Sequence, residues 1–277
     1  EQSTWLNNDK KIISLDLSED NESIFGKLTD RSLLLKEIAH VQSGTTGFDY
    51  TRYGNLISEN EQAGFIKFVI TKNIEPYFIN WEKKIHYFKK TLQRAYFDVE
   101  NAIVTEGRKS LYKDKNKILV RGMSRKLICG LDTEGYASGV GTYAITDSKY
   151  NPFYLLTILN SKLADYFYKT KFISKHLAGG YIGYNVSQLE QIPIYKIDLL
   201  NPAEKSKHDE LVRLAREAFK LNKESQSVEK GTNRWNQINS EIQKTDKLID
   251  QKVYELYGLN DKEIEIIEKT NDTNHKG

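Results

Sequence analysis

The stretch YLLTILNSKL, residues 154–163, is the most informative part of this sequence because the hydrophobic period of the chain changes there. Over 153–169 the apolar residues recur at the spacing of an amphipathic helix. Pro152 suits the first turn of such a helix, and Asn151 suits its N-cap. The pattern therefore predicts one helix over 153–169.

Short segments rich in β-branched and aromatic residues precede this helix and predict strands. The predicted strands are 65–70, 117–121, 127–129 and 142–145, with turns at Gly130-Leu131-Asp132 and at Gly135. Residues 192–194 form one more extended piece after the helix. Short strands combined with packed helices predict an α+β fold with mixed topology.

Two parts of different character flank this mixed region. Residues 1–34 read as a polar lead-in with a short helix around 24–28. Residues 201–277 carry two long amphipathic patterns with a loop over 224–233, then a short capped helix and a frayed end over 270–277. We expect an antiparallel helix pair that shares an apolar seam. The predicted parts are therefore 1–34, a mixed domain over 35–200 and a helical tail over 201–277.

The charge is distributed unevenly along a chain of 277 residues, which is long enough to bury a sizeable core. In total, 41 Lys and Arg stand against 38 Asp and Glu. Residues 82–126 alone hold 13 Lys and Arg against 5 Asp and Glu. A local excess of this kind is typical of a face that binds a polyanion, and it also fits an ordinary solvated surface.

Several classes of protein are excluded or disfavoured. No apolar run approaches the ~20 residues of a membrane helix, and the single cysteine, Cys129, rules out an internal disulfide framework and a Cys-based zinc site. The histidines show no metal-ligand spacing, and no phosphate-binding loop occurs. We expect a cytoplasmic fragment of a longer protein, because the chain begins at Glu1 without a signal peptide. It has no catalytic or metal site that the sequence reveals.

Two weak catalytic patterns run against this expectation. Residues 151–154 read Asn-Pro-Phe-Tyr, similar to the Asn-Pro-Pro-Tyr loop of amino-methyltransferases, but with one proline fewer and no glycine-rich cofactor segment before it. Glu75, Glu82 and Lys84 could be fitted to the acidic pattern of a nuclease, which a chain this charged contains by chance. We therefore expect a protein that binds rather than catalyses.

An ordered series of segments resembles one known family. The segments are 35–39, 44–47, 65–67, 73–74, Trp81, 117–121, 142–145, 154–163, 189–194 and 249–259. Together they resemble the C-terminal specificity domain of TaqI-like adenine DNA methyltransferases, a region also found in restriction-modification enzymes and phage-defence methylases. Each segment is weak by itself, whereas the series over 35–260 is fairly specific.

The resemblance implies that 35–200 is a DNA target-recognition domain that binds double-stranded DNA in a sequence-specific way. The domain would hold the site while a methyltransferase core, in the same parent chain or in another subunit, extrudes an adenine. The core would lie outside this chain, so the fragment would be no enzyme and hold no cofactor. S-adenosylmethionine is expected for the parent enzyme, which could also carry a nuclease.

Candidate DNA-binding residues follow from the division between phosphate contacts, which position, and base contacts, which specify. The candidates for phosphate contacts are Lys83, Lys84, Lys89, Lys90, Arg108, Lys109, Lys113 and Lys115. Lys67 and Lys126 are further DNA-binding candidates. Arg94, Arg121 and Arg125 could read guanine with a bidentate fork. Thr45, Thr46, Tyr181 and Tyr184 lie near glycines, in loops that could approach a groove. For each residue the alternative is an ordinary surface position.

Two further expectations concern the signature residues and the tail. Asn160, Ser161 and Lys162 are expected to cap and pack helices rather than read bases. The apolar faces of the tail either pack on each other and on the mixed domain, or form a spacer or docking surface. In the latter case the chain would be a protein-interaction or scaffold module that docks through its C-terminal helices, and the basic stretch would be incidental.

Overall fold

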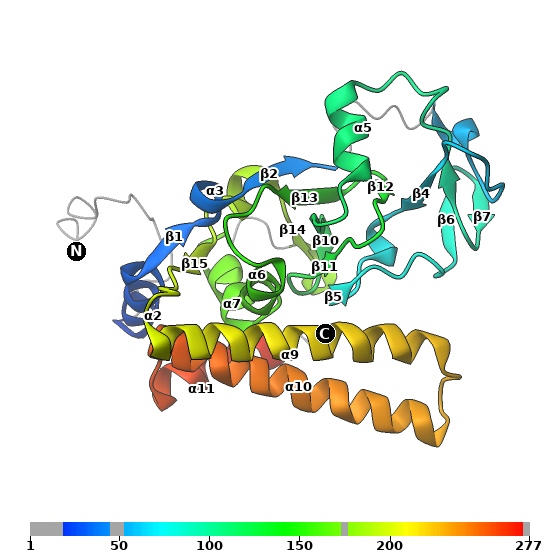
Figure 1. The fold of residues 1–277 in the computed structure, drawn as a ribbon. Helices are drawn as coiled ribbons and strands as arrows, with labels where there is room; N and C mark the ends of the chain where they lie inside the picture. Colours follow the sequence, from blue (N-terminus) through cyan, green and yellow to red (C-terminus); the bar gives the residue numbers. More distant parts are fainter. Residues whose placement is uncertain (1–18, 45–52, 173–176, 274–277) are drawn as a thin grey trace.

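A five-stranded sheet lies at the centre of the computed structural model, which describes residues 19–44, 53–172 and 177–273 (Figure 1). Its strands in spatial order are β2 (His40–Ser43), β13 (Thr142–Thr146), β9 (Ile118–Arg121), β11 (Cys129–Leu131) and β5 (Tyr77–Phe78). The first four run antiparallel to their neighbours, and β5 joins the edge of β11 in parallel. The prediction of an α+β fold is confirmed.

The central strand β9 separates two hydrophobic clusters. Ile118 and Val120 point into the main core, which contains helices α6 (Pro152–Leu159) and α7 (Lys162–Lys171). Leu119 points to the opposite face and packs in a smaller cluster with Ala144 of β13. This alternation follows the two-residue period of a strand. The sheet is therefore buried on both faces at β9.

A second lobe carries much of the basic stretch and has a hydrophobic cluster of its own (Figure 1). Its four-stranded sheet has the order β12 (Ala137–Ser138), β4 (Ile66–Val69), β8 (Tyr96–Phe97) and β3 (Ile57–Ser58). The hairpin β6 (Ile85–Tyr87) and β7 (Lys90–Leu92), helix α5 (Glu106–Lys113) and the short turns η1 (Gly54–Leu56) and η2 (Thr71–Asn73) complete it. The predicted strands at 65–70, 117–121 and 142–145 are confirmed by β4, β9 and β13.

The predicted strand 127–129 and the turn after it are shifted in the structure. Strand β11 runs through Gly130, where a turn was predicted. The reason is the parallel strand β5, whose backbone approaches closely: a Cβ on Gly130 would lie 2.6 Å from the carbonyl oxygen of Phe78. Gly130 is needed here for close strand contact rather than for a turn.

The single helix predicted over 153–169 is wrong, because the chain breaks between α6 and α7. Pro152 and the Asn151 cap are confirmed at the start of α6, where the Asn151 side chain accepts from the Phe153 N–H. At the break, Asn160 Oδ1 accepts from the Cys129 N–H at 2.9 Å and its Nδ2 donates to the Cys129 carbonyl at 3.0 Å. Ser161 then caps α7. Asn160 thus joins β11 instead of continuing a helix.

The two ends of the mixed region meet in a small sheet. Strand β1 (Ser32–Leu34) follows helix α2 (Glu19–Asp30) and pairs with β15 (Pro193–Tyr195), which confirms the extended piece predicted near 192–194. The short helix α3 (Leu35–Ile38) follows β1 directly, and the short helix α8 (Val186–Leu189) precedes β15. Helix α2 confirms the predicted N-terminal helix. The boundaries at 34/35 and 200/201 stay predictions.

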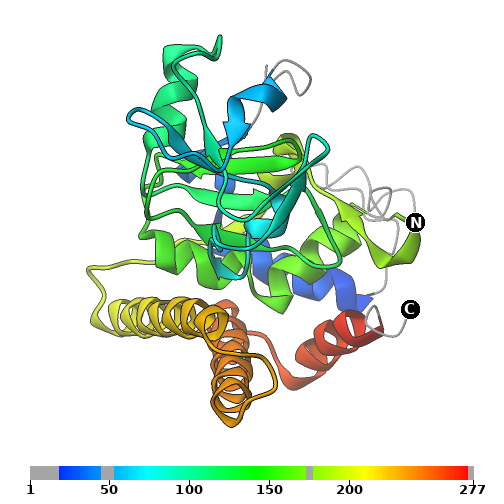
Figure 2. The same ribbon diagram turned by 90° about the vertical axis from the view of Figure 1, so that its right-hand side faces the viewer.

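Two long helices, α9 (Pro202–Ser227) and α10 (Asn233–Tyr257), run side by side below the sheets in both views (Figures 1 and 2). Their apolar residues belong to the same cluster as α6 and α7, so the tail packs on itself and on the mixed domain. The predicted helix pair is confirmed, with a loop of 228–232 that is shorter than expected.

The last helix, α11 (Asp261–Thr273), is longer than predicted. The expectation of frayed residues from 270 onward is wrong up to 273, and 274–277 lie outside the described residues. The cause is Asn271, which is buried and donates to the Lys162 carbonyl at 3.2 Å and to the Ile267 carbonyl at 2.9 Å. These contacts hold the last turn of α11 against the start of α7.

A buried ion pair connects β9 to the turn after β11. Lys117 Nζ lies 2.5 Å from Asp132 Oδ2, and the two side chains are 1% and 0% exposed. The ammonium also donates to the carbonyls of Tyr112 and Asp114. The carboxylate accepts the backbone N–H groups of residues 134–136 at 2.7–2.9 Å. Burial lowers the pKa of Lys117, and the Asp132 carboxylate opposes that shift.

We expect Asp132→Ala to lower the free energy of unfolding by about 3–5 kcal/mol, because it leaves a buried ammonium without its counterion. Urea denaturation would measure the loss. The control is Glu134→Ala, which removes a partly exposed ion pair with Lys67 only two residues away and should cost less than about 1 kcal/mol. Equal losses in the two variants would contradict the structural role given to the buried pair.

Candidate nucleic-acid interface

Several of the predicted DNA-binding residues are already paired with carboxylates. The pairs are Lys67 with Glu134, Lys83 with Glu75, Arg94 with Glu82, Lys109 with Glu106 and Glu100, and Arg121 with Glu75. An intramolecular partner reduces the charge that a side chain offers to a phosphate. The net charge of the stretch therefore overstates the number of free cations.

Arg121 is the clearest case of a predicted base reader with a structural role. Its Nε donates to the Ile74 carbonyl at 2.6 Å and its Nη2 lies 2.9 Å from Glu75 Oε2. The side chain is only 20% exposed, and burial lowers the pKa of its guanidinium. Reaching guanine would require Arg121 to give up these contacts, so the structure directs its fork inward.

Two more basic candidates bond to backbone carbonyls. Arg108 Nη1 donates to the Ser43 carbonyl at 2.6 Å and links α5 to the end of β2. Lys90 Nζ donates to the carbonyls of Gly54 and Ile57, each at 3.2 Å, and holds the β6–β7 hairpin on η1. Both side chains position elements of the second lobe.

Six candidates remain exposed and form no ion pair with other residues that the structure describes. They are Lys84, Lys89, Lys113, Lys115, Arg125 and Lys126. Lys89 occupies the tip of the hairpin, where Phe88 and Lys89 have φ angles of 47° and 60°. Positive φ at both positions is typical of a two-residue type I′ turn. These exposed side chains are the ones free to contact phosphates.

The four loop candidates have different surroundings. Thr45 and Thr46 lie outside the described residues. Tyr181 is 42% exposed, and the Arg125 guanidinium carbon lies 5.6 Å from the centroid of its ring. Tyr184 is only 3% exposed and packs against Tyr168 with ring centroids 4.6 Å apart. The structure thus corrects the expectation for Tyr184, because its ring faces the core rather than a groove.

Arg125 and Tyr181 are brought together by a two-stranded ribbon that sequence reasoning did not find. It consists of β10 (Met123–Ser124) and β14 (Ile182–Gly183), with Met123 paired to Gly183. Each strand has only two residues, which is too short for a periodic pattern to be recognised. Exposed Met123 in the ribbon and exposed Leu177 near it were therefore missed as well.

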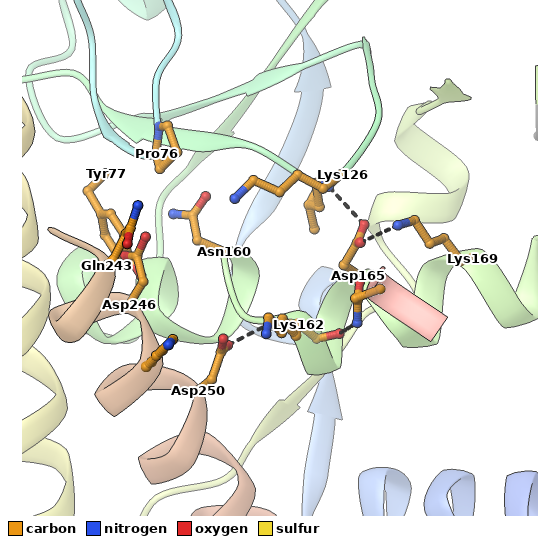
Figure 3. A pocket seen from close by; sticks show the side chains of 13 residues that line it. Pro76, Tyr77, Lys126, Asn160, Lys162, Asp165, Lys169, Gln243, Asp246 and Asp250 are labelled. Carbon is orange, nitrogen blue, oxygen red and sulfur yellow. Dashed lines mark hydrogen bonds and ion pairs between the residues drawn. The ribbon is translucent and has the colours of Figure 1, made fainter. Parts of the chain in front are cut away.

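A cavity of about 220 Å³ lies where α10 meets the α6–α7 junction (Figure 3). Charged and polar side chains line it, among them Lys126, Asn160, Asp165, Lys169, Asp246 and Asp250. Asp165 Oδ1 accepts from the Leu127 N–H at 2.9 Å, while its Oδ2 lies 2.6 Å from Lys169 Nζ. Burial raises the pKa of Asp165, and the Lys169 ammonium opposes that rise.

Asp250 connects the tail to the signature residues at this cavity. Its Oδ1 accepts from the Lys162 N–H at 2.9 Å, at the start of α7, and Lys162 Nζ pairs with Glu268 of α11. Burial raises the pKa of Asp250 to about 7, and the bond from Lys162 acts against that rise. Asn160, Ser161 and Lys162 therefore bridge β11, α7 and the tail, as expected for capping and packing residues.

The described residues show no arrangement that supports the catalytic patterns considered from the sequence. Within the described ranges, no three His, Cys, Asp or Glu side chains form a group that could hold a metal ion. Glu75 is paired with Lys83 and Arg121, and Glu82 with Arg94. Cys129 is buried, and burial raises the pKa of its thiol. None of the helices in the part that the structure describes is long and apolar enough to cross a membrane.

Comparison with known families identifies the region that holds these features. Residues 67–194 match the family model of the TaqI-like C-terminal specificity domain. Over these residues the chain is similar to a TaqI-like specificity domain. The matched region runs from β4 to β15 and includes the Lys117–Asp132 pair, the ribbon and the Asn160 junction. The tail lies beyond the matched residues of the specificity domain.

One solved structure has a similar fold. The type IIG restriction endonuclease BpuSI has a TM-score of 0.50 and 10% sequence identity, with 87% of this chain and 34% of that chain covered. The type IIL restriction-modification enzyme MmeI, solved in complex with DNA, has a TM-score of 0.47 and 10% identity, with coverages of 88% and 36%. The chain thus spans about a third of either length. No curated protein matches the chain.

The carboxyl group of Asp250 should make stability depend on pH. Its folded-state pKa lies above the ordinary value of 3.8, so the folded chain binds the proton more tightly and loses stability as pH rises from about 4 to about 7. Asp250→Asn keeps the acceptor for the Lys162 N–H without the charge. We expect the variant to be more stable than the wild type by on the order of 2–4 kcal/mol at pH 8, with little difference near pH 4.

Urea denaturation at several pH values measures this difference. The control is Asp209→Asn, which removes an exposed carboxylate of α9 whose pKa is lowered by Lys205 and His208. Its curve should not show a gain that grows between pH 4 and pH 7. Parallel pH profiles for wild type and Asp250→Asn would contradict the raised pKa at the junction.

Proposed function

We propose that this chain recognises a specific sequence in double-stranded DNA, as the target-recognition part of a restriction-modification adenine methyltransferase. The observation that carries the proposal is the match of residues 67–194 to the TaqI-like specificity domain. The likeness of fold to a restriction endonuclease is in keeping with it. In this arrangement the catalytic domain and its S-adenosylmethionine lie outside the chain, and the specificity domain positions the target adenine.

The free lysines support binding to a polyanion. Lys84 precedes β6 and Lys89 is at the tip of the same hairpin, in the second lobe. Lys113 is the last residue of α5, and Lys115 lies two residues beyond it. Each phosphate that such a side chain neutralises releases condensed counterions, so the affinity falls with salt concentration. These contacts hold the duplex without reading its sequence.

The scaffold alternative is less well supported by the tail. The buried apolar residues of α9 and α10 pack in one core with those of α6 and α7. Among the described residues of 201–273, Leu248 is the one large apolar side chain that is exposed, at 36%. A helix pair with so little exposed apolar surface offers a poor docking face for a protein partner. The basic lobe therefore remains the better candidate surface.

Reversal of three free lysines tests DNA binding without disturbing the fold. We expect Lys84→Glu, Lys113→Glu and Lys115→Glu together to weaken duplex binding at low salt and to reduce the slope of log K against log salt. Three lost phosphate contacts correspond to a change of about 2.7 in that slope. Fluorescence anisotropy with a randomised duplex pool, at low and moderate salt, gives both quantities.

The matched control reverses Lys207, Lys220 and Lys223 of α9, which changes the net charge by the same amount on the tail. Reversal of Arg121 or Lys109 would be a poor test, since it would place like charges beside Glu75 or Glu106. Sequencing of the duplexes retained by the wild type should reveal one short motif. Equal losses in both triple variants, or no duplex binding by the wild type, would contradict the proposal.

A further inference from the structure

We propose that the β10–β14 ribbon is the element that reads base edges, by entering the major groove with Arg125, Met123 and Tyr181. The inference rests on the proposed function and assigns the specificity to one site within it. The major groove is about 12 Å wide and admits a two-stranded β-ribbon. The lysines of the second lobe then hold the backbone, while the ribbon determines the sequence.

The ribbon has one buried and one exposed face. Register pairs Met123 with Gly183 and Ser124 with Ile182. Ser124 and Ile182 are 4% and 2% exposed, so their face packs on the core. Alternation along each strand places Met123 and Gly183 on the opposite face. That face also has Arg125 and Tyr181, whose side chains are in contact next to the last paired residues.

The exposed face is apolar to an unusual degree. Met123 is 55% exposed, Leu177 45% and Tyr181 42%. The Leu177 N–H donates to the Tyr181 carbonyl at 2.7 Å, and a Cβ on Gly183 would lie 4.0 Å from Leu177 Cδ1. The three side chains thus surround a position that has no side chain. Clustered apolar surface of this kind indicates that a partner covers it.

The chemistry of the face fits DNA better than a protein surface. The Arg125 guanidinium lies over the Tyr181 ring at 5.6 Å, which leaves a planar fork of donors at the ribbon. Such a fork matches the N7 and O6 acceptors of guanine, and apolar side chains match the methyl group of thymine. Arg125 is exposed and forms no ion pair with the residues that the structure describes. The face therefore combines positive charge with apolar contacts.

The ribbon is also held rigidly, as a reading element requires. The Tyr184 N–H donates to the Gly122 carbonyl at 2.9 Å, which ties the end of β14 to the start of β10. Gly122 is needed for this path, because a Cβ there would lie 2.3 Å from the Gly141 carbonyl oxygen. Glycine at 183 leaves the centre of the face open to close approach.

The test uses the full chain and the motif that it selects from a randomised duplex pool. Replacing guanine by 7-deazaguanine removes N7, and replacing thymine by uracil removes the methyl group. One guanine should be sensitive to 7-deazaguanine in the wild type and insensitive in Arg125→Ala. One thymine should be sensitive to uracil in the wild type and insensitive in Met123→Ala or Tyr181→Ala. Arg125→Ala should reduce discrimination at its guanine by roughly 5- to 150-fold.

Two control variants distinguish base recognition from phosphate binding and from the general effect of changing an exposed side chain. Lys113→Ala, at an exposed lysine of α5, should weaken all duplexes alike and leave the selected motif unchanged. Leu200→Ala removes an apolar side chain that is 93% exposed and outside the ribbon, and should change neither property. Thermal unfolding of each variant would confirm that the fold is retained.

The outcomes distinguish this inference from the proposed function. Altered preference in the ribbon variants, coupled to the modified bases, supports base reading by the ribbon. An unchanged motif in all three ribbon variants, with a clear motif in the wild type, overturns the inference alone and assigns the apolar face to another partner. A uniform loss of affinity overturns it too, because the ribbon would then only grip. No motif in the wild type overturns both proposals.

Discussion

The buried pair of Lys117 and Asp132 is the constraint on which the fold of the matched region, 67–194, depends. Three acceptors surround the ammonium, and the carboxylate also accepts three backbone N–H groups. A charge buried without its partner costs several kcal/mol. The end of α5, the start of β9 and the turn after β11 must therefore come together before either charge can be buried favourably. One pair thus joins the central sheet to the second lobe.

Strand β9 connects the buried pair at its start to the ribbon that follows its end. It has Lys117 before it and Arg121 at its end, where the chain turns through Gly122 into the ribbon. The strand is buried on both faces, so it transmits position with little freedom. The exposed face of the ribbon is consequently placed by interactions in the interior. Under the proposed base-reading role, such placement would fix the side chains to within a fraction of an ångström.

The sequence predicted those elements that local periodicity defines, and it could not predict those defined by distant partners. Strands β9 and β13 and the long helices α9 and α10 show their period within a short window. The break at Asn160 arises because its side chain bonds to Cys129, 31 residues earlier. Likewise the carboxylate beside Arg121 comes from Glu75, 46 residues away. No window of sequence contains both partners of such contacts.

The same limit explains why counting charges is a weak guide to the candidate site. The excess of basic residues in 82–126 predicts a polyanion-binding face, yet Arg94, Lys109 and Arg121 lie against carboxylates. Charge that is neutralised within the fold contributes little to the binding of a polyanion, whereas a few exposed groups in a fixed geometry can discriminate between bases. Affinity for DNA therefore depends on which cations the fold leaves unpaired. Specificity depends on which hydrogen-bond donors and apolar groups the fold keeps in a fixed position.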